Sequence, residues 1–147
     1  MKILKYQTTH LKDCLSMFKT NIPTFFAKNE IFLFQRYLLE KDIHYYVLLE
    51  KNILIAAGGY GINKKQKTID LTWGMVNSKY HKKGFGTKLL NYRIKRILTD
   101  FPKTDITLNT SQKTFKFYKK FDFKLEKITK NYYCDGLDRY DMKKSVS

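Results

Sequence analysis

The spacing of apolar residues changes at several points along the chain, and each change predicts a new structural element. Polar and apolar residues alternate from Lys2 to Thr8, which is the period of a half-buried strand. Apolar residues then recur at helical spacing at Leu11, Cys14, Leu15 and Phe18. Pro23 interrupts this helix, and a second helical stripe runs from Ile31 to Leu39, with Asn29 as a candidate N-cap. The chain therefore opens as a strand followed by two helices.

The middle of the chain has the pattern of three antiparallel strands. Residues 44–49 and 53–60 are rich in aromatic and β-branched side chains, and the short polar turn Lys51-Asn52 separates them. A second polar turn at residues 63–67 leads to a third strand-like run at residues 68–76. We expect this segment to form a meander of three consecutive strands.

The last part of the chain alternates between helix and strand. After Gly86, apolar residues recur at helical spacing as far as Asp100. A strand is then expected at 105–108, a helix at 112–120, a strand at 123–129 and a last strand ending near 138–142. The order β-α-α-β-β-β-α-β-α-β-β predicts an α/β protein with a mixed sheet and helices on both faces. The length fits one domain over residues 1–147.

The charge of the chain narrows the choice of partners only slightly. There are 29 Lys and Arg against 13 Asp and Glu, and the resulting charge of +16 attracts nucleic acid, anionic membranes and phosphate-rich ligands alike. Only four of the basic residues are arginine, and the lysines are scattered along the whole length. Nucleic-acid sites concentrate arginine, whose guanidinium binds phosphates and bases bidentately. The distribution therefore favours a solvated lysine surface over a nucleic-acid partner.

The apolar runs and the cysteines indicate the setting of the protein. No run of about 18 uncharged apolar residues is present, and residues 1–7 lack the apolar core of a signal peptide. Cys14 and Cys134 lie in unrelated contexts, without a CxxC pair or a neighbouring His cluster. We expect a cytoplasmic protein with no membrane partner, no disulfide framework and no bound metal.

The loop from His81 to Lys88 carries the strongest chemical signal. Its sequence, His-Lys-Lys-Gly-Phe-Gly-Thr-Lys, joins a predicted strand to a predicted helix. Glycines let the backbone approach an anion, and the helix presents its positive N-terminus, so the loop fits a pyrophosphate. The small residue that ends a dinucleotide fingerprint is replaced by Leu89, and the spacing of a Walker loop is absent. A glycine-bearing loop that merely begins a helix stays the alternative.

Two segments resemble motifs of the GNAT superfamily of acyl-CoA-dependent N-acetyltransferases. Val76 to Leu90 resembles the acyl-CoA-binding motif, whose core is Gln/Arg-x-x-Gly-x-Gly/Ala between a strand and a helix. Phe117 to Phe123 resembles the apolar-Tyr-x-x-x-Gly-Phe motif, with Tyr118 in the general-acid position. The element order is also that of the family, and the resemblance covers most of the chain from Ile43 to Met142. It implies a single-domain GNAT-like sheet of about seven strands.

The chain departs from the family pattern at three positions. His81 stands where Gln or Arg is usual, Ser111 where many members have Asn, and Asp122 where Gly is usual. A pyrophosphate is held mainly by backbone N–H groups, so a side-chain change at His81 should cost less than a change at a loop glycine. Asp tolerates a left-handed backbone better than most residues, so Asp122 is expected to replace the helix-ending glycine.

The resemblance implies transfer of an acetyl group from acetyl-CoA to a primary amine of a small molecule or protein, by direct attack in a cleft where two parallel strands separate. A module that binds acyl-CoA or nucleic acid without turnover is the alternative. Members are often dimers, which leaves a homodimer open. The residues expected to bind the cofactor are Met75, Val76, His81, Lys82, Lys83, Gly84, Phe85, Gly86, Thr87 and Ser111.

The reaction also needs groups for the oxyanion, the leaving thiolate and the amine proton. We expect the backbone of residues 74–76 to serve the oxyanion, because Gly74 in an apolar strand indicates a bulge or a close approach. Tyr118 is expected to hydrogen-bond the thiolate, with a purely packing role as its alternative. Asp70 and Glu50 are equal candidates for the base. Strand alternation would place Asp70, Thr72, Gly74 and Val76 on one face.

The acceptor pocket is the least readable part of the sequence. The family resemblance points to the helices between residues 10 and 41 and to the segment 132–136 as its lining. Asp135, Asp138 and Asp141 are candidates to attract a cationic acceptor, or are surface groups beside lysines.

Overall fold

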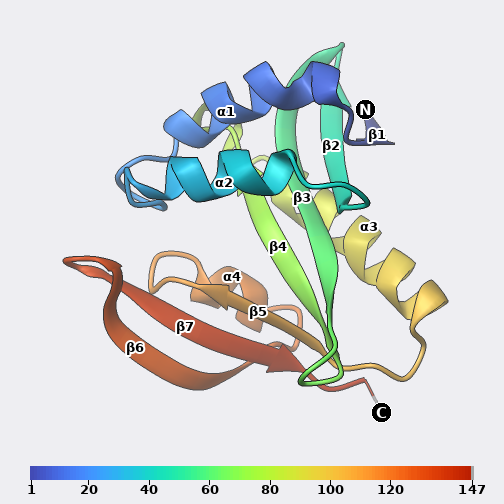
Figure 1. Cartoon of the computed structure of the whole chain (residues 1–147), viewed down its shortest axis with the longest axis vertical. Coiled ribbons are helices and arrows are strands. Elements are labelled where there is room, and N and C mark those ends of the chain that lie inside the picture. Colours follow the sequence, from blue (N-terminus) through green and yellow to red (C-terminus); the bar gives the residue numbers. More distant parts are fainter. Residues whose placement is uncertain (147) are drawn as a thin grey trace.

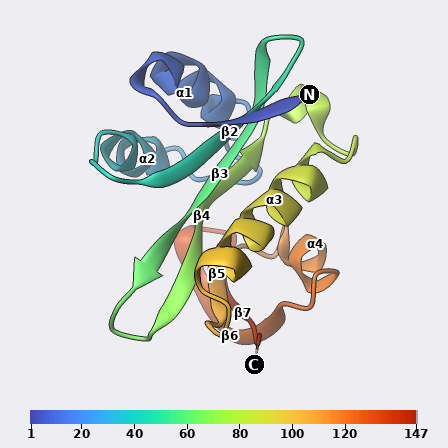
Figure 2. The same ribbon diagram turned by 90° about the vertical axis from the view of Figure 1, so that its right-hand side faces the viewer.

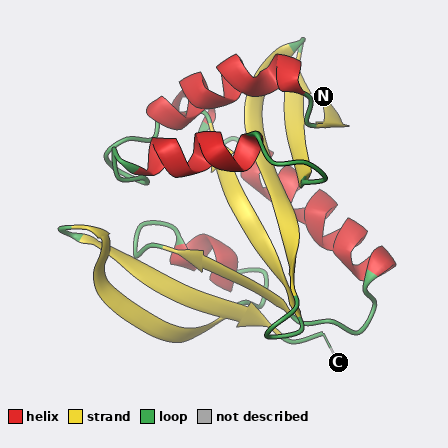
Figure 3. Ribbon diagram, viewed as in Figure 1, coloured by secondary structure: helices red, strands yellow, loops and turns green. Residues whose placement is uncertain are grey.

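All the helices and strands of the expected order are present in the computed structural model of the chain, which describes residues 1–146. The elements are β1 (Lys2–Lys5), α1 (Leu11–Lys19), α2 (Glu30–Leu38), β2 (His44–Glu50), β3 (Ile53–Asn63), β4 (Thr68–Val76), α3 (Phe85–Asp100), β5 (Ile106–Thr110), α4 (Phe115–Lys119), β6 (Lys124–Cys134) and β7 (Leu137–Lys144). Short 3-10 helices at Thr8–His10 and Ser78–Tyr80 complete the chain (Figure 3). The order predicted from the sequence is therefore confirmed.

The helices cover both faces of one sheet. Helices α1 and α2 lie together over the N-terminal strands, and α3 and α4 lie on the opposite side (Figures 1 and 2). The two faces carry separate apolar cores. Phe18 and Phe34 stack beneath α1 and α2 with ring centroids 5.3 Å apart, and Leu90 and Ile97 anchor α3 on the other face. The expected α/β sheet with two helical layers is confirmed.

Strands β4 and β5 pair over a very short length. The seven strands follow the order β1-β2-β3-β4-β5-β7-β6, and the β4–β5 pair is parallel. Its register consists of Ile69 with Ile106 and Asp70 with Thr107. Beyond these residues β4 continues to Val76 without pairing to β5, so the two strands separate. A gap is left in the middle of the sheet, where the family resemblance implied one.

A β-bulge in β4 changes the direction of its side chains. The register with β3 shifts between Ala57 and Gly59, and Trp73 has a positive φ of 42°. Thr72 bonds Tyr37 of α2, and Met75 also lies in the core beneath α1 and α2, although an unbroken strand would turn residues 72 and 75 to opposite faces. The expectation that Val76 shares a face with Thr72 is therefore wrong, because the bulge turns Val76 towards α3.

The C-terminal hairpin is longer than the sequence pattern predicted. Strand β6 continues to Cys134 because it pairs with β7 as far as the Cys134–Leu137 register. Its pattern is hard to read because most of its side chains are exposed. The left-handed turn expected at Asp122 is present, with φ of 68°. Among the described residues, no helix is both long and apolar enough to cross a membrane.

Candidate active site

A cavity of about 830 Å³ lies where β4 and β5 separate. One side, which we call the loop wall, is formed by the loop before α3 and the first turn of that helix, and comprises Tyr80, His81, Lys82 and residues 84–87. The other side, the aromatic wall, comprises Phe25, Phe26, Glu30, Trp73, Asn109 and Tyr133. The strand edges 71–76 and 108–111 lie between the two walls, with Tyr118 and Arg93 also in the lining.

The loop wall presents a row of free backbone donors. Lys82 and Gly84 have φ values of 63° and 85°, so the backbone turns through two left-handed residues before α3 begins. No acceptor in residues 1–146 takes a hydrogen bond from the N–H groups of residues 82–87. Free N–H groups at the N-terminus of a helix are suited to bind an anion.

The two loop glycines differ in backbone conformation and surroundings. A methyl group added at Gly84 would meet no protein atom within 4 Å, so the protein itself leaves room there, and only the left-handed φ favours glycine. A methyl group at Gly86 would lie 3.5 Å from the Phe117 ring and 3.6 Å from Val76. Glycine is therefore favoured at position 84 by the backbone conformation, whereas at position 86 a methyl group would make ordinary van der Waals contacts with α4 and β4.

The structure brings almost all the expected cofactor residues to the cavity. Met75, Val76, His81, Lys82, Gly84, Phe85, Gly86, Thr87 and Ser111 line it. Lys83 does not line it, and its ammonium lies 5.6 Å from the centroid of the Tyr80 ring. The sequence pattern could not separate these adjacent lysines, of which only Lys82 has a positive φ in the structure.

Val76 directs its backbone into the gap between the strands. Asn77 donates to Ile55 O at 2.8 Å, and hydrogen-bonded pairs alternate in an antiparallel ladder, so the polar groups of Val76 point away from β3. Its carbonyl confirms this direction: Asn21 Nδ2 donates to it at 3.0 Å, and His81 Nε2 lies 2.8 Å away. The same alternation turns the N–H of Met75 towards β3. Val76 rather than Met75 therefore offers a free N–H in the gap.

Tyr118 lies on α4 with its ring held by aromatic neighbours. Phe117 and Phe123 pack edge-on against it at centroid distances of 5.1 and 6.0 Å. Within the described chain its hydroxyl has no hydrogen-bond partner. The phenol is therefore fixed in position yet free to donate into the cavity.

The two carboxylates expected as base candidates lie in very different places. Asp70 lines the cavity at the point where β4 and β5 separate, and it accepts hydrogen bonds from Asn63 Nδ2 at 3.2 Å and from the Thr107 hydroxyl. Glu50 lies at the far end of β2 outside the cavity, 3.7 Å from the N-terminal ammonium of Met1. The structure therefore does not bring Glu50 to the site, since β3 and β4 lie between β2 and the gap.

Sequence reasoning missed the charged group of the aromatic wall. Glu30 at the start of α2 is 8% exposed, and its Oε2 accepts the Ala27 N–H at 2.7 Å. Burial raises the pKa of this carboxyl, and the Ala27 hydrogen bond opposes that shift only in part. Tyr133 donates to Asn109 Oδ1 at 2.6 Å, and burial raises the pKa of its phenol. Tyr133 lies in the segment 132–136 that the family resemblance gave as pocket lining, whereas no local motif marks Glu30, because it meets the other residues of this wall only through the tertiary fold.

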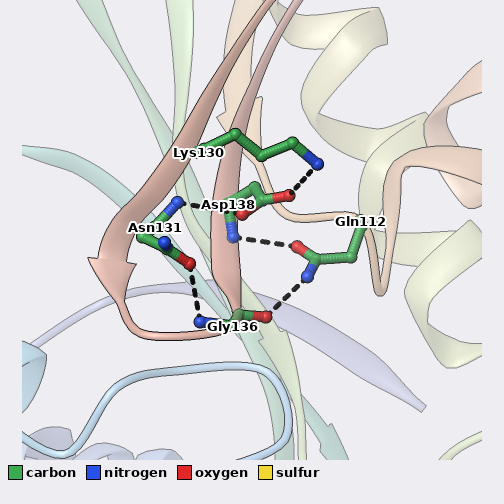
Figure 4. Close-up of polar contacts among 5 residues, drawn as sticks. All are labelled: Gln112, Lys130, Asn131, Gly136 and Asp138. Atoms are coloured by element: carbon green, nitrogen blue, oxygen red, sulfur yellow. Dashed lines mark hydrogen bonds and ion pairs between the residues drawn. The ribbon is translucent and has the colours of Figure 1, made fainter.

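A hydrogen-bond network fixes the end of the hairpin that carries Tyr133 (Figure 4). Gln112, in the loop after β5, donates from Nε2 to Gly136 O at 2.6 Å and accepts from Asp138 N at 2.9 Å. Asp138 accepts the Asn131 N–H at 2.9 Å and pairs with Lys130 at 3.3 Å. That backbone hydrogen bond first, and the Lys130 contacts after it, lower the pKa of the Asp138 carboxyl.

The acidic residues expected to attract a cationic acceptor are engaged elsewhere. Asp138 belongs to the hairpin network, and Asp141 pairs with Arg139 at 2.9 Å. Neither of them, nor Asp135, lines the cavity. No cluster of His, Cys, Asp and Glu in residues 1–146 has the arrangement of a metal site.

Comparison with known proteins identifies the family of this fold. A family model described as an acetyltransferase (GNAT) domain matches residues 19–146. An N-alpha-acetyltransferase of Saccharolobus solfataricus is 24% identical over 158 residues, which cover 92% of this chain and 89% of that protein. The ribosomal-protein-S18-alanine N-acetyltransferase of Escherichia coli superposes with a TM-score of 0.82 at 16% identity, covering 99% of this chain and 94% of that one.

A solved structure with a bound ligand has the same fold. An aminoglycoside 6′-N-acetyltransferase in complex with coenzyme A superposes with a TM-score of 0.79 at 13% identity, covering 100% of this chain and 98% of that one. At such identities the superposition shows a shared fold, and the family match over residues 19–146 shows the membership.

Proposed function

The chain belongs to the GNAT family of acetyl-CoA-dependent N-acetyltransferases, and on this premise we propose that its cavity joins an acetyl group from acetyl-CoA to a primary amine by direct attack. We also propose that the whole of residues 1–147 forms this one catalytic domain. One observation carries the proposal: Lys82 and residues 84–87, whose N–H groups are free, line the same cavity as Tyr118, whose hydroxyl is free within the described chain.

The loop wall is the place for the cofactor. The N–H groups of residues 82–87 bind the pyrophosphate, and the Lys82 ammonium adds positive charge beside them. The Val76 N–H bonds a pantetheine amide in the gap between the strands, with Ser111 on the facing edge. With the cofactor bound in this way, we expect the thioester to lie between β4 and α4, within reach of Tyr118.

Tyr118 stabilises the departing thiolate by a hydrogen bond. A phenol has a pKa near 10 and a thiol near 8.5, so complete proton transfer from the phenol would be uphill by roughly 2 kcal/mol. A hydrogen bond that strengthens as charge builds on sulfur avoids this cost. The free hydroxyl and the aromatic packing of the ring support this role.

Two carboxylates are candidates to take the proton of the amine. Asp70, the candidate base named from the sequence, remains a candidate, although its oxygens already accept hydrogen bonds from Asn63 and Thr107. Glu30 is the added candidate, because it lies among the aromatic rings where an ammonium group would be held. Burial raises the pKa of Glu30, which makes its ionised carboxylate a stronger proton acceptor than that of an ordinary glutamate.

The acceptor is a primary amine that enters along the aromatic wall. Of the proteins similar to this chain, one is by its name an N-alpha-acetyltransferase, one acts on an alanine of ribosomal protein S18, and one acts on an aminoglycoside. A protein or peptide amine and a small-molecule amine, such as an amino sugar, are therefore the two classes to compare.

The test is release of free thiol from acetyl-CoA in the presence of a panel of amines. We expect turnover with at least one peptide, amino sugar or polyamine, and a mass gain of one acetyl group on that amine. Binding of acetyl-CoA without any transfer would support the non-catalytic alternative. A salt-dependent gel shift with nucleic acid, without thiol release, would contradict the proposal.

A further inference from the structure

Arg93 on α3 is a buried cation without a counter-ion. Its side chain is 3% exposed, and none of the ion pairs among the described residues includes it. Nη1 donates to Gly59 O at 3.1 Å, whereas Nε is buried without any partner. Burying a guanidinium that lacks an anionic partner costs free energy of folding, so a purely structural role does not account for an arginine at this position.

Glycines on two strands make room for this guanidinium. A methyl group at Gly58 would lie 2.8 Å from Cζ of Arg93, and one at Gly74 would lie 2.8 Å from Nη2. Both glycines lie in the bulged part of the β3–β4 pair, where Tyr45 also donates to Trp73 O at 2.7 Å. The bulge and the two glycines therefore bring a positive charge from α3 against the backbone of β4.

The guanidinium lies in the lining of the cavity described above. Nη2, the nitrogen beside Gly74, has no hydrogen-bond partner in residues 1–146. Gly74 lies on the β4 edge of the cavity, two residues before Val76, whose N–H is assigned above to the pantetheine. The unused Nη2 donor of Arg93 therefore lies beside the β4 edge of the cavity.

We propose that Arg93 is a further catalytic residue, whose Nη2 hydrogen-bonds the thioester oxygen and stabilises the negative charge that develops on it. The amine nitrogen forms a bond to the carbonyl carbon, and the π electron pair moves to this oxygen. The pair returns when the C–S bond breaks, sulfur leaves with its bonding electrons, and the amine proton passes to a carboxylate. A donor placed in advance in a buried site is the most effective means of stabilising such charge.

The inference rests on the proposed function, and infrared spectroscopy tests it without knowledge of the acceptor. Acetyl-CoA labelled with heavy carbon at the thioester carbonyl is bound to the wild type, to Arg93→Met and to Arg96→Met. Arg96 is the matched control, because it lies one turn along α3 with its guanidinium over Tyr46 and Tyr92, outside the cavity lining. We expect the carbonyl band to move to lower frequency on binding to wild type and Arg96→Met, and most of that shift to be lost in Arg93→Met.

Turnover gives the second readout. Arg93→Met should lower kcat on the order of 10²-fold, the effect of removing one oxyanion donor, and change the affinity for acetyl-CoA less than threefold. Arg93→Lys keeps the charge and the alkyl stem, so it should retain part of the band shift, and it replaces Arg93→Met if that variant does not fold. An unchanged band in a folded Arg93→Met, or loss of acetyl-CoA binding with an intact fold, would overturn the proposal. A wild type that neither binds acetyl-CoA nor transfers its acetyl group would instead refute the proposed function.

Discussion

The loop wall and the aromatic wall of the cavity are built in opposite ways. The loop wall comes from consecutive residues, and its chemistry belongs to backbone N–H groups and a helix N-terminus. The aromatic wall joins side chains from four separate segments, from Phe25 to Tyr133, and its chemistry belongs to those side chains. The backbone wall should therefore tolerate side-chain changes that preserve its turn, whereas the side-chain wall can change specificity by single substitutions. Each prediction below tests one side of this contrast.

The largest effect is expected at Gly84. Gly84→Val places a branched side chain in the open space above the loop and strains a φ of 85°, so acetyl-CoA binding should fall by more than 100-fold in calorimetry. Gly136→Val is the matched control, since Gly136 has φ of 83° and equally open surroundings but lies in the hairpin turn. Equal affinity in wild type and Gly84→Val would discredit the pyrophosphate assignment.

A smaller effect is expected at Tyr118. Tyr118→Phe keeps the packing against Phe117 and Phe123 but removes the hydroxyl, so kcat should fall on the order of 10²-fold while acetyl-CoA affinity is preserved. The matched control is Tyr132→Phe, since Tyr132 is 54% exposed and outside the cavity lining. Turnover of Tyr118→Phe within twofold of wild type would remove this residue from the acid role.

On the aromatic wall, Glu30→Gln should lower kcat/KM about tenfold at neutral pH, less than the usual gain from a general base because Asp70 lines the same cavity. The rate of the wild type should fall as pH drops through the pKa of Glu30, which burial raises above the ordinary glutamate value. Asp70→Asn is the competing variant. If it alone removes the acid limb of the pH profile, Asp70 rather than Glu30 takes the proton.

Glu30 also gives a prediction for stability with an opposite sign to that for activity. Because the pKa of Glu30 is raised in the folded state, its contribution is most favourable when it is protonated, and it is lost as pH rises through the folded-state pKa. Glu30→Gln should therefore raise the Tm by a few degrees at pH 8 and by much less near pH 4. The exposed Glu40 provides the control variant, Glu40→Gln.

The smallest effect is expected in the hairpin network. Gln112→Ala removes the two hydrogen bonds to Gly136 and Asp138, so the hairpin that carries Tyr133 should be less well positioned. We expect KM for the amine to rise about fivefold, the value of roughly one hydrogen bond, with acetyl-CoA affinity unchanged. An equal loss for both substrates would mean that the network supports the whole cavity rather than the aromatic wall.

The same contrast explains which features the sequence could predict. The element order, the loop from His81 to Lys88 and the left-handed Asp122 follow from local spacing and backbone preferences, which a single sequence displays. Glu30 and Arg93 become neighbours of the cavity only after strands and helices pack, so no spacing in the sequence identifies them, whereas Tyr133 lies in the segment 132–136 to which the family resemblance pointed. The face of Val76 was misassigned because one extra residue in a bulge reverses the alternation, and Gly74 indicated a bulge without giving its effect on register.

The short pairing between β4 and β5 has a consequence for the mechanics of the molecule. The parallel register that joins strands β1–β4 to strands β5–β7 contains only two residue pairs. This junction therefore has fewer backbone hydrogen bonds than the other strand pairs that it connects. An extended ligand with its own amide groups would form hydrogen bonds to both strands where β4 and β5 do not pair with each other. Binding should then strengthen the connection between the two halves of the sheet, and amide exchange should slow in both β4 and β5 at once.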